Sequence, residues 1–263
     1  MRDNKAAGFA GGMTIGALGG LIGLGGAEFR LPLLIGLFRF AALEAVILNK
    51  AMSLVVVATA LPFRAGTVPL SEVASHWPIV VNLLAGSLLG AWFGADWALR
   101  LKAATLHRVI AVLLLVIALV LILGHGGDAG GAPLFIGWQQ MVAGVVAGFA
   151  IGVVASLLGV AGGELLIPTL ILLFGADIKL AGSLSLAVSL PTMLVGFARY
   201  SRDQSFVVLR KNSRFVLVMA LGSIVGTFIG GRLLGVIPSA VLLPLLAVIL
   251  VVSAFKVWRH SEH

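Results

Sequence analysis

Residues 19–32 read GGLIGLGGAEFRLP and residues 155–168 read ASLLGVAGGELLIP, so a glycine-rich segment that ends in proline occurs twice in the chain. An offset of 136 positions, from 19 to 155, aligns the two segments without a gap. The same offset aligns further glycine and serine residues, namely Gly8 with Gly144, Gly12 with Gly148, Gly16 with Gly152, Ser53 with Ser189, Gly86 with Gly222 and Gly90 with Gly226. We infer that the chain consists of two copies of one unit.

The composition places the chain in a membrane. Of the 263 residues, 60% are hydrophobic and only 11% are charged. A soluble domain usually carries about 25% charged residues, whereas long uncharged apolar runs are typical of chains that lie in lipid. The net charge of +8 does not indicate nucleic-acid binding, because the basic residues are dispersed between apolar segments and no RNA- or DNA-binding motif is present. We predict an all-α polytopic membrane protein with the lipid bilayer as partner.

Each copy contains five apolar stretches. They are residues 8–22, 29–38, 43–61, 77–97 and 106–123 in the first copy, and 138–158, 165–174, 180–197, 215–234 and 239–257 in the second. A helix that crosses a bilayer needs about 20 residues, so the last three stretches of each copy are expected to span. The first two are expected to form short or broken, glycine-interrupted helices that meet near the bilayer midplane. The predicted boundaries are 1–124 for the first repeat, 125–137 for a glycine-rich loop and 138–263 for the second repeat.

The basic residues indicate how the copies are oriented. Twelve of the eighteen Lys and Arg residues lie in four places, residues 1–5, 100–108, 199–214 and 256–259. By the positive-inside rule these places, and with them both termini, face the cytoplasm. The equivalent positions of the other copy are poor in basic residues, since Arg64 alone lies in the loop that corresponds to 199–214. We therefore predict an inverted-topology repeat, an architecture typical of secondary transporters.

The irregular glycine clusters before Glu28 and Glu164 are candidates for a ligand site. If these glutamates begin the second short helices, the amide groups at the two helix N-termini carry partial positive charge and bind anions. The predicted pocket for a small anion is lined by the backbone of Gly25, Gly26, Ala27, Gly162 and Gly163. A bulky residue at Gly26 or Gly162 is expected to abolish binding and leave the fold largely intact. Helix packing alone is the alternative, and it is the interpretation preferred for the regularly spaced glycines elsewhere.

Polar side chains in the third apolar stretch of each copy are expected to complete this pocket. Asn49 and Ser53 lie four residues apart and so share one face of a helix, as do their counterparts Ser185 and Ser189. Amide and hydroxyl groups can donate hydrogen bonds to an oxyanion. Serine in a membrane helix also often bonds the backbone of its own helix, which is the competing interpretation.

Three charged residues within the apolar region are further candidates. Glu28 and Glu164 are predicted to carry a proton, because a carboxylate inside a membrane is costly unless it is neutralised or paired. Alternatively, each glutamate complements its helix dipole or pairs with a neighbour such as Arg30 or Lys50. Lys50 is expected to meet the substrate or to neutralise Glu28. Its counterpart in the second copy is Leu186, so this feature is not symmetric.

The sequence gives little support to an enzyme. There is no cysteine, no HExxH or phosphate-binding loop motif, and no pair of histidines at helical spacing for a metal. We therefore expect no catalytic residue, no metal and no cofactor. An anion channel is left open as an alternative to a carrier, because inverted repeats and half-helices also build pores.

The repeated segment, the duplication and the chain length resemble the TauE/SafE family of sulfite exporters and organosulfonate permeases. Members typically have three glycines followed five residues later by proline. Here Ala27 replaces the third glycine in the first copy, and Ala161 replaces the first glycine in the second. The resemblance implies secondary transport of sulfite, or of an organosulfonate such as sulfoacetate, across a bacterial inner membrane by alternating access. A different small anion, and either a monomer or a homodimer, stay open.

Overall fold

The computed structural model describes residues 5–40, 42–97, 115, 119, 133–158, 160–200 and 205–259, and over these residues it contains helices and no strand. The predicted all-α class is confirmed. The fifth apolar stretch of the first copy, apart from Leu115 and Leu119, and residues 125–132 of the inter-repeat loop lie outside the described residues.

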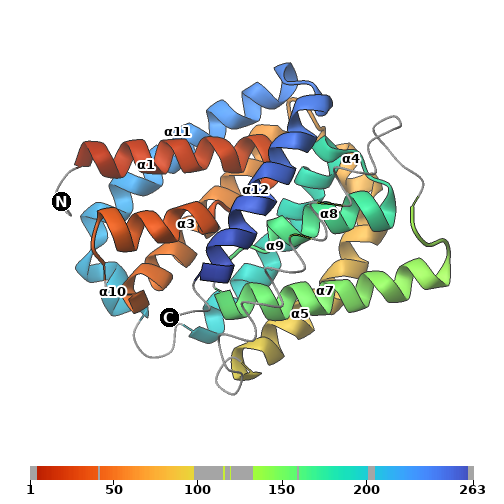
Figure 1. Ribbon diagram of the computed structural model, residues 1–263, viewed down its shortest axis with the longest axis horizontal. Helices are drawn as coiled ribbons and strands as arrows, with labels where there is room; N and C mark the ends of the chain where they lie inside the picture. The colour runs from red at the N-terminus through yellow and green to blue at the C-terminus, as the bar shows by residue number, and fades with distance from the viewer. Residues whose placement is uncertain are drawn as a thin grey trace.

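The α-helices described over residues 5–97 recur in the same order in the second copy, whereas the two π-helical turns are seen in the first copy (Figure 1). The elements of the first copy are α1 (Lys5–Leu18), η1 (Gly19–Gly23), α2 (Ala27–Pro32), η2 (Leu33–Leu37), α3 (Ala42–Arg64), α4 (Leu70–Ser75) and α5 (Trp77–Trp97). Those of the second copy are α7 (Trp138–Leu158), α8 (Gly163–Phe174), α9 (Ile178–Tyr200), α10 (Ser205–Lys211), α11 (Ser213–Val236) and α12 (Ser239–Arg259). The offset of 136 positions places α3 on α9 and the start of α5 on the start of α11.

Among the described residues, six helices are long and apolar enough to cross a membrane. They are Lys5–Gly23, Ile47–Arg64, Trp77–Gly94, Trp138–Ser156, Ile178–Gly196 and Ser213–Val236. The expectation that the first stretch of each copy is too short to span is therefore wrong. In the first copy the helix does not end at the glycines, because α1 passes into a turn of π-helix, η1, that extends it to Gly23. The second stretch of each copy is short, as predicted.

Large apolar side chains are exposed along α5, α7 and α11. They include Leu89, Trp92 and Phe93 on α5, Met141, Val142 and Val146 on α7, and Leu217, Leu221 and Val225 on α11. Apolar surface of this extent is unfavourable in water but is what a lipid-facing helix presents. The protein is therefore a multi-pass membrane protein.

The first and the last described helices of α1–α5 pack closely against helices of the other copy. Helix α1 packs along α11, and α7 packs along α5 (Figure 1). A Cβ atom on Gly16 would overlap the carbonyl oxygen of Ser223, and one on Gly152 would overlap that of Ser87. Because Gly16 and Gly152 are counterparts, as are Ser223 and Ser87, the second contact repeats the first about an internal pseudo-two-fold axis. The packing role predicted for the regularly spaced glycines is confirmed.

Gly16→Leu and Gly152→Leu are expected to destabilise the protein to a similar extent. Each new side chain must push two helix backbones apart, and overpacking of this kind costs about 1–3 kcal/mol. The thermal unfolding midpoint in detergent measures the effect. Gly66→Leu is the matched control, because nothing lies within 4 Å of a Cβ atom at Gly66. Thermal midpoints equal to that of the wild type in both Gly16→Leu and Gly152→Leu would contradict the close packing of α1 on α11 and of α7 on α5.

The counterparts α3 and α9 pack against each other in the centre of the bundle and run antiparallel. Arg64, the last residue of α3, donates to the carbonyl oxygen of Lys179 near the start of α9, at 2.7 Å. Near the other end, Lys50 Nζ lies 3.7 Å from where a Cβ atom on Gly196 would stand. The two copies therefore place their equivalent central helices in opposite directions.

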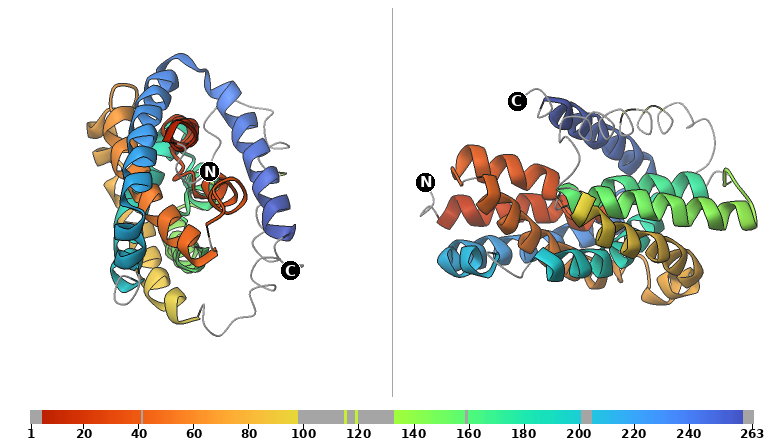
Figure 2. Two further views of the ribbon diagram at one scale, coloured as in Figure 1. Left: turned by 90° about the vertical axis from the view of Figure 1, so that its left-hand side faces the viewer. Right: turned by 90° about the horizontal axis from the view of Figure 1, so that it is seen from below.

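Helix α12 lies along one side of the bundle, as both views of Figure 2 show. Leu242, Leu246 and Ile249 are buried and belong to the largest hydrophobic core cluster. Its apolar segment, Ser239–Ile249, is shorter than the six candidate spans. Helix α12 thus closes the core on this side.

Candidate functional site

The two glycine clusters form loops of matching conformation. Gly26 stands directly before α2 with φ 68°, and Gly162 stands directly before α8 with φ 75°. Positive φ is unfavourable for residues with a Cβ atom, so glycine is needed at both positions. The first amide groups of each following helix have no acceptor within that helix. Both loops therefore direct helix N-termini into the interior, as the sequence predicted.

The two loops meet in the centre of the molecule. A Cβ atom on Gly25 would lie 2.5 Å from the Cβ atom of Ala161, and one on Gly163 would lie 3.2 Å from the carbonyl oxygen of Gly23. Gly25 and Ala161 are counterparts in the two copies. A contact between counterparts must lie on the pseudo-two-fold axis, so the axis passes between the loops.

The expectation that a bulky residue at Gly26 leaves the fold intact is wrong. A Cβ atom there would overlap Cγ2 of Ile15, and the positive φ strains any other residue. At Gly162 the φ is also positive, and a Cβ atom would lie 3.1 Å from Cγ2 of Ile151. Substitution of these glycines perturbs the backbone, so other residues give cleaner tests of the site.

Arg30 brings a positive charge to the first loop. This residue of α2 is completely buried. Its Nη1 donates to Ser53 Oγ at 2.8 Å and to Asn49 Oδ1 at 3.5 Å, and its Nη2 donates to the carbonyl oxygen of Gly25 at 3.5 Å. The predicted shared face of Asn49 and Ser53 is confirmed, and it is directed at this guanidinium. Arg30 is the one charge in the stretch 29–38, but the sequence indicated it only as a partner for the two glutamates.

The serines of the second copy hold the loops by hydrogen bonds. Ser189 Oγ donates to the carbonyl oxygen of Ala161 at 2.8 Å, and Ser185 Oγ donates to that of Gly23 at 3.4 Å. Both hydroxyls are buried, and both of these acceptors lie outside α9, the helix that carries the serines. Ser185 therefore links α9 to the loop of the first copy, and Ser189 links α9 to the loop of the second.

The other charged candidates lie at different places around the loops. Glu164 is buried in the first turn of α8. Lys50 is buried on α3 and faces Gly196 of α9, whereas Asn49 and Ser53 face Arg30. Glu28 belongs to α2, and its side chain lies outside the described part of the structure.

The position of Arg64 differs from the one expected from the sequence. It lies not in a loop but at the end of α3, completely buried. Its Nη1 donates to the carbonyl oxygens of Gly20 at 2.9 Å and Leu21 at 2.8 Å, and its Nε donates to Ser183 Oγ at 3.0 Å. The helix ends at Gly23, so the carbonyl groups of its last turn have no donor within the helix, and the guanidinium binds them. Arg64 therefore ties η1 of the first copy to α9 of the second.

The antiparallel central helices, the two loops that meet between them and the buried Arg30 define a polytopic helical membrane protein built from two related halves. The family model of the sulfite exporter TauE/SafE matches residues 2–121 and again residues 144–263. The chain therefore belongs to the TauE/SafE family, a family of membrane transporters, and the resemblance noted in the repeated segment is confirmed. No curated protein and no solved structure matches the chain.

Proposed function

We propose that the protein is a secondary transporter for a small sulfur oxyanion, either sulfite or an organosulfonate such as sulfoacetate. Family membership supports the class of substrate. The single observation that carries the site is the completely buried Arg30 beside the meeting point of the two loops. Because the Arg30 guanidinium is already desolvated, the charge-assisted hydrogen bonds that it donates to a bound anion are stronger than they would be in water.

The geometry suits sulfite and sulfonate oxygens, which only accept hydrogen bonds. An arginine guanidinium presents five N–H groups in a planar fork that matches oxyanions, and charge-assisted bonds of this kind are stronger than neutral ones. In the proposed site Arg30 holds the anion together with amides of Gly25, Gly26 and Ala27 from one loop. Gly162 and Gly163 contribute from the other loop.

The polar neighbours have separate proposed roles. Asn49 and Ser53 orient Arg30, while Ser185 and Ser189 position the loop carbonyl groups so that the amides face the substrate. Glu28 and Glu164 are the proposed proton carriers. Lys50 adds positive potential from α3, where it faces Gly196.

Transport is proposed to proceed by alternating access between two inverted repeats, residues 1–124 and 138–263. The antiparallel arrangement of α3 and α9 supports this assignment, because counterparts in inverted repeats run in opposite directions. The proposed location is a bacterial inner membrane with both termini in the cytoplasm.

A binding screen by isothermal titration calorimetry tests the substrate class. Purified protein is titrated with sulfite, sulfoacetate, taurine, thiosulfate and sulfate. We expect sulfite or sulfoacetate to bind most tightly. Taurine should bind more weakly than sulfoacetate, because its ammonium group is repelled by the Arg30 guanidinium. Absence of binding for every sulfur anion, or tightest binding of taurine, would contradict the proposal.

A further inference from the structure

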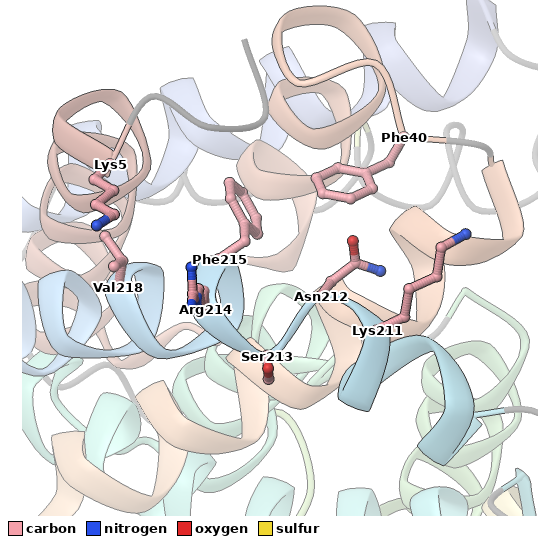
Figure 3. A pocket seen from close by; sticks show the side chains of 8 residues that line it. All are labelled: Lys5, Phe40, Lys211, Asn212, Ser213, Arg214, Phe215 and Val218. Atoms are coloured by element: carbon pink, nitrogen blue, oxygen red, sulfur yellow. The ribbon is translucent and has the colours of Figure 1, made fainter.

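A second basic site lies far from the glycine loops, at the end of the molecule where α1, α3 and α11 begin. It is a pocket of about 470 Å³ (Figure 3). We call it the basic pocket, and define it by Lys5, Phe40, Lys211, Arg214, Phe215 and Val218, which line it. Its volume lies within the usual range for pockets that hold small ligands, roughly 300–1,000 Å³.

Three cations surround the basic pocket, and they come from separate elements. Lys5 begins α1, Lys211 ends α10, and Arg214 lies in the first turn of α11. Among the described residues that line the pocket there is no acidic side chain. Glu44 on α3 approaches from outside the lining, with its Oε1 atom 3.6 Å from Lys211 Nζ, and offsets part of the charge of that lysine. The pocket therefore keeps an excess of positive charge.

The inner wall of the basic pocket is aromatic. Phe40 is almost completely buried, and its ring lies 5.0 Å from that of Phe215 between centroids. The ring of Phe38 also packs edge-on against that of Phe215, with 4.8 Å between the centroids, which holds this wall in place. Val218 extends the apolar lining along α11. Cations at the opening and an apolar wall behind them match an amphiphilic ligand rather than a fully hydrated ion.

The depth of the pocket in the membrane follows from its residues. Lys5 is the first residue of one candidate span, and the span on α11 begins at Ser213. The ends of transmembrane spans lie at the level of the lipid headgroups. Lys5, Lys211 and Arg214 also belong to two of the basic clusters that the positive-inside rule assigns to the cytoplasmic side, where anionic lipids are concentrated.

We propose that the basic pocket binds the phosphate group of an anionic phospholipid headgroup, with Lys5 and Arg214 as the principal cationic contacts. The headgroup phosphate lies between the two cations, and the upper part of an acyl chain lies against Phe40 and Phe215. A soluble phosphate group has the same charge and the same acceptor atoms, so the experiment must separate the two sources. The proposal is independent of which anion the protein transports.

Binding of short-chain phosphatidylglycerol and phosphatidylcholine to the purified protein, measured by calorimetry, tests the proposal. Wild-type protein should bind phosphatidylglycerol clearly more tightly than phosphatidylcholine. Lys5→Gln/Arg214→Gln should bind phosphatidylglycerol at least tenfold more weakly, with an unchanged thermal midpoint. Arg232→Gln is the matched control, because it removes an exposed cation near the other end of α11 and should bind like wild type.

Three outcomes would overturn the proposal. The first is equal affinity for the two lipids, and the second is wild-type affinity in Lys5→Gln/Arg214→Gln. The third is binding of inorganic phosphate as tightly as phosphatidylglycerol, with loss in the same variant, which would assign the pocket to a soluble anion. If the variant unfolds, Arg214→Gln alone is tested, and wild-type affinity in that protein also overturns the proposal.

Discussion

Arg30→Leu should reduce the affinity for the sulfur anion by roughly 100-fold or more, because each hydrogen bond to a charged group contributes about 1.5–3 kcal/mol. Leucine is also the residue at the matching position of the second copy, Leu166, which is buried in the hydrophobic core. An apolar side chain of this size therefore suits the matching position, but Ser53, Asn49 and the Gly25 carbonyl oxygen lose a donor, so Arg30→Leu should also lower the stability.

Arg30→Lys separates charge from geometry at the same position. Lysine keeps the positive charge but loses the planar fork of N–H donors. The expected affinity lies between that of wild type and that of Arg30→Leu. Titration calorimetry with the tightest ligand from the screen measures all three proteins, and thermal unfolding checks that each is folded. Wild-type affinity in folded Arg30→Leu would remove Arg30 from the binding site.

Arg64→Leu should cause the largest loss of stability. The substitution takes the donor away from the carbonyl oxygens of Gly20, Leu21 and Lys179. A buried polar group left without a partner costs about 1–3 kcal/mol, so the total should exceed about 3 kcal/mol. The thermal midpoint should fall by roughly 2–4 °C for each kcal/mol.

Arg232→Leu is the control for Arg64→Leu. Arg232 is exposed on α11, where its guanidinium lies 5.2 Å from the centre of the Phe228 ring. Removal of an exposed side chain usually changes stability by no more than about 0.5 kcal/mol. Similar midpoints for the two variants would show that Arg64 does not tie η1 to α9.

Much of the fold could be predicted because its determinants are local in the sequence. A constant offset between two glycine-to-proline segments indicates a duplication, and long uncharged stretches indicate membrane helices. The spacing of Gly86, Gly90 and Gly94 indicates a helix face that a second backbone approaches. The partner of that face, α7 of the other copy, could not be predicted, since several helices carry glycines at the same spacing.

The candidate site could be predicted only in part. The glycine clusters before Glu28 and Glu164 mark loops whose conformation requires glycine, and the structure brings these loops together. The roles of Arg30 and Arg64 depend on which carbonyl groups lie close in space. The turn of π-helix that extends α1 to Gly23, and so brings the carbonyl groups of Gly20 and Leu21 to Arg64, has no signature in the sequence. The distribution of basic residues therefore predicted that Arg64 lies in a loop, whereas it lies in the interior at the end of α3.

Anion flux into proteoliposomes tests the central claim most directly. Wild-type protein is compared with Arg30→Leu, using sulfite and sulfoacetate at increasing concentration, with and without a proton gradient. The account predicts flux that saturates with concentration, responds to the gradient and is lost in Arg30→Leu. Flux that rises without saturation, or that is the same in wild type and folded Arg30→Leu, would contradict a carrier with its binding site at the meeting point of the two loops.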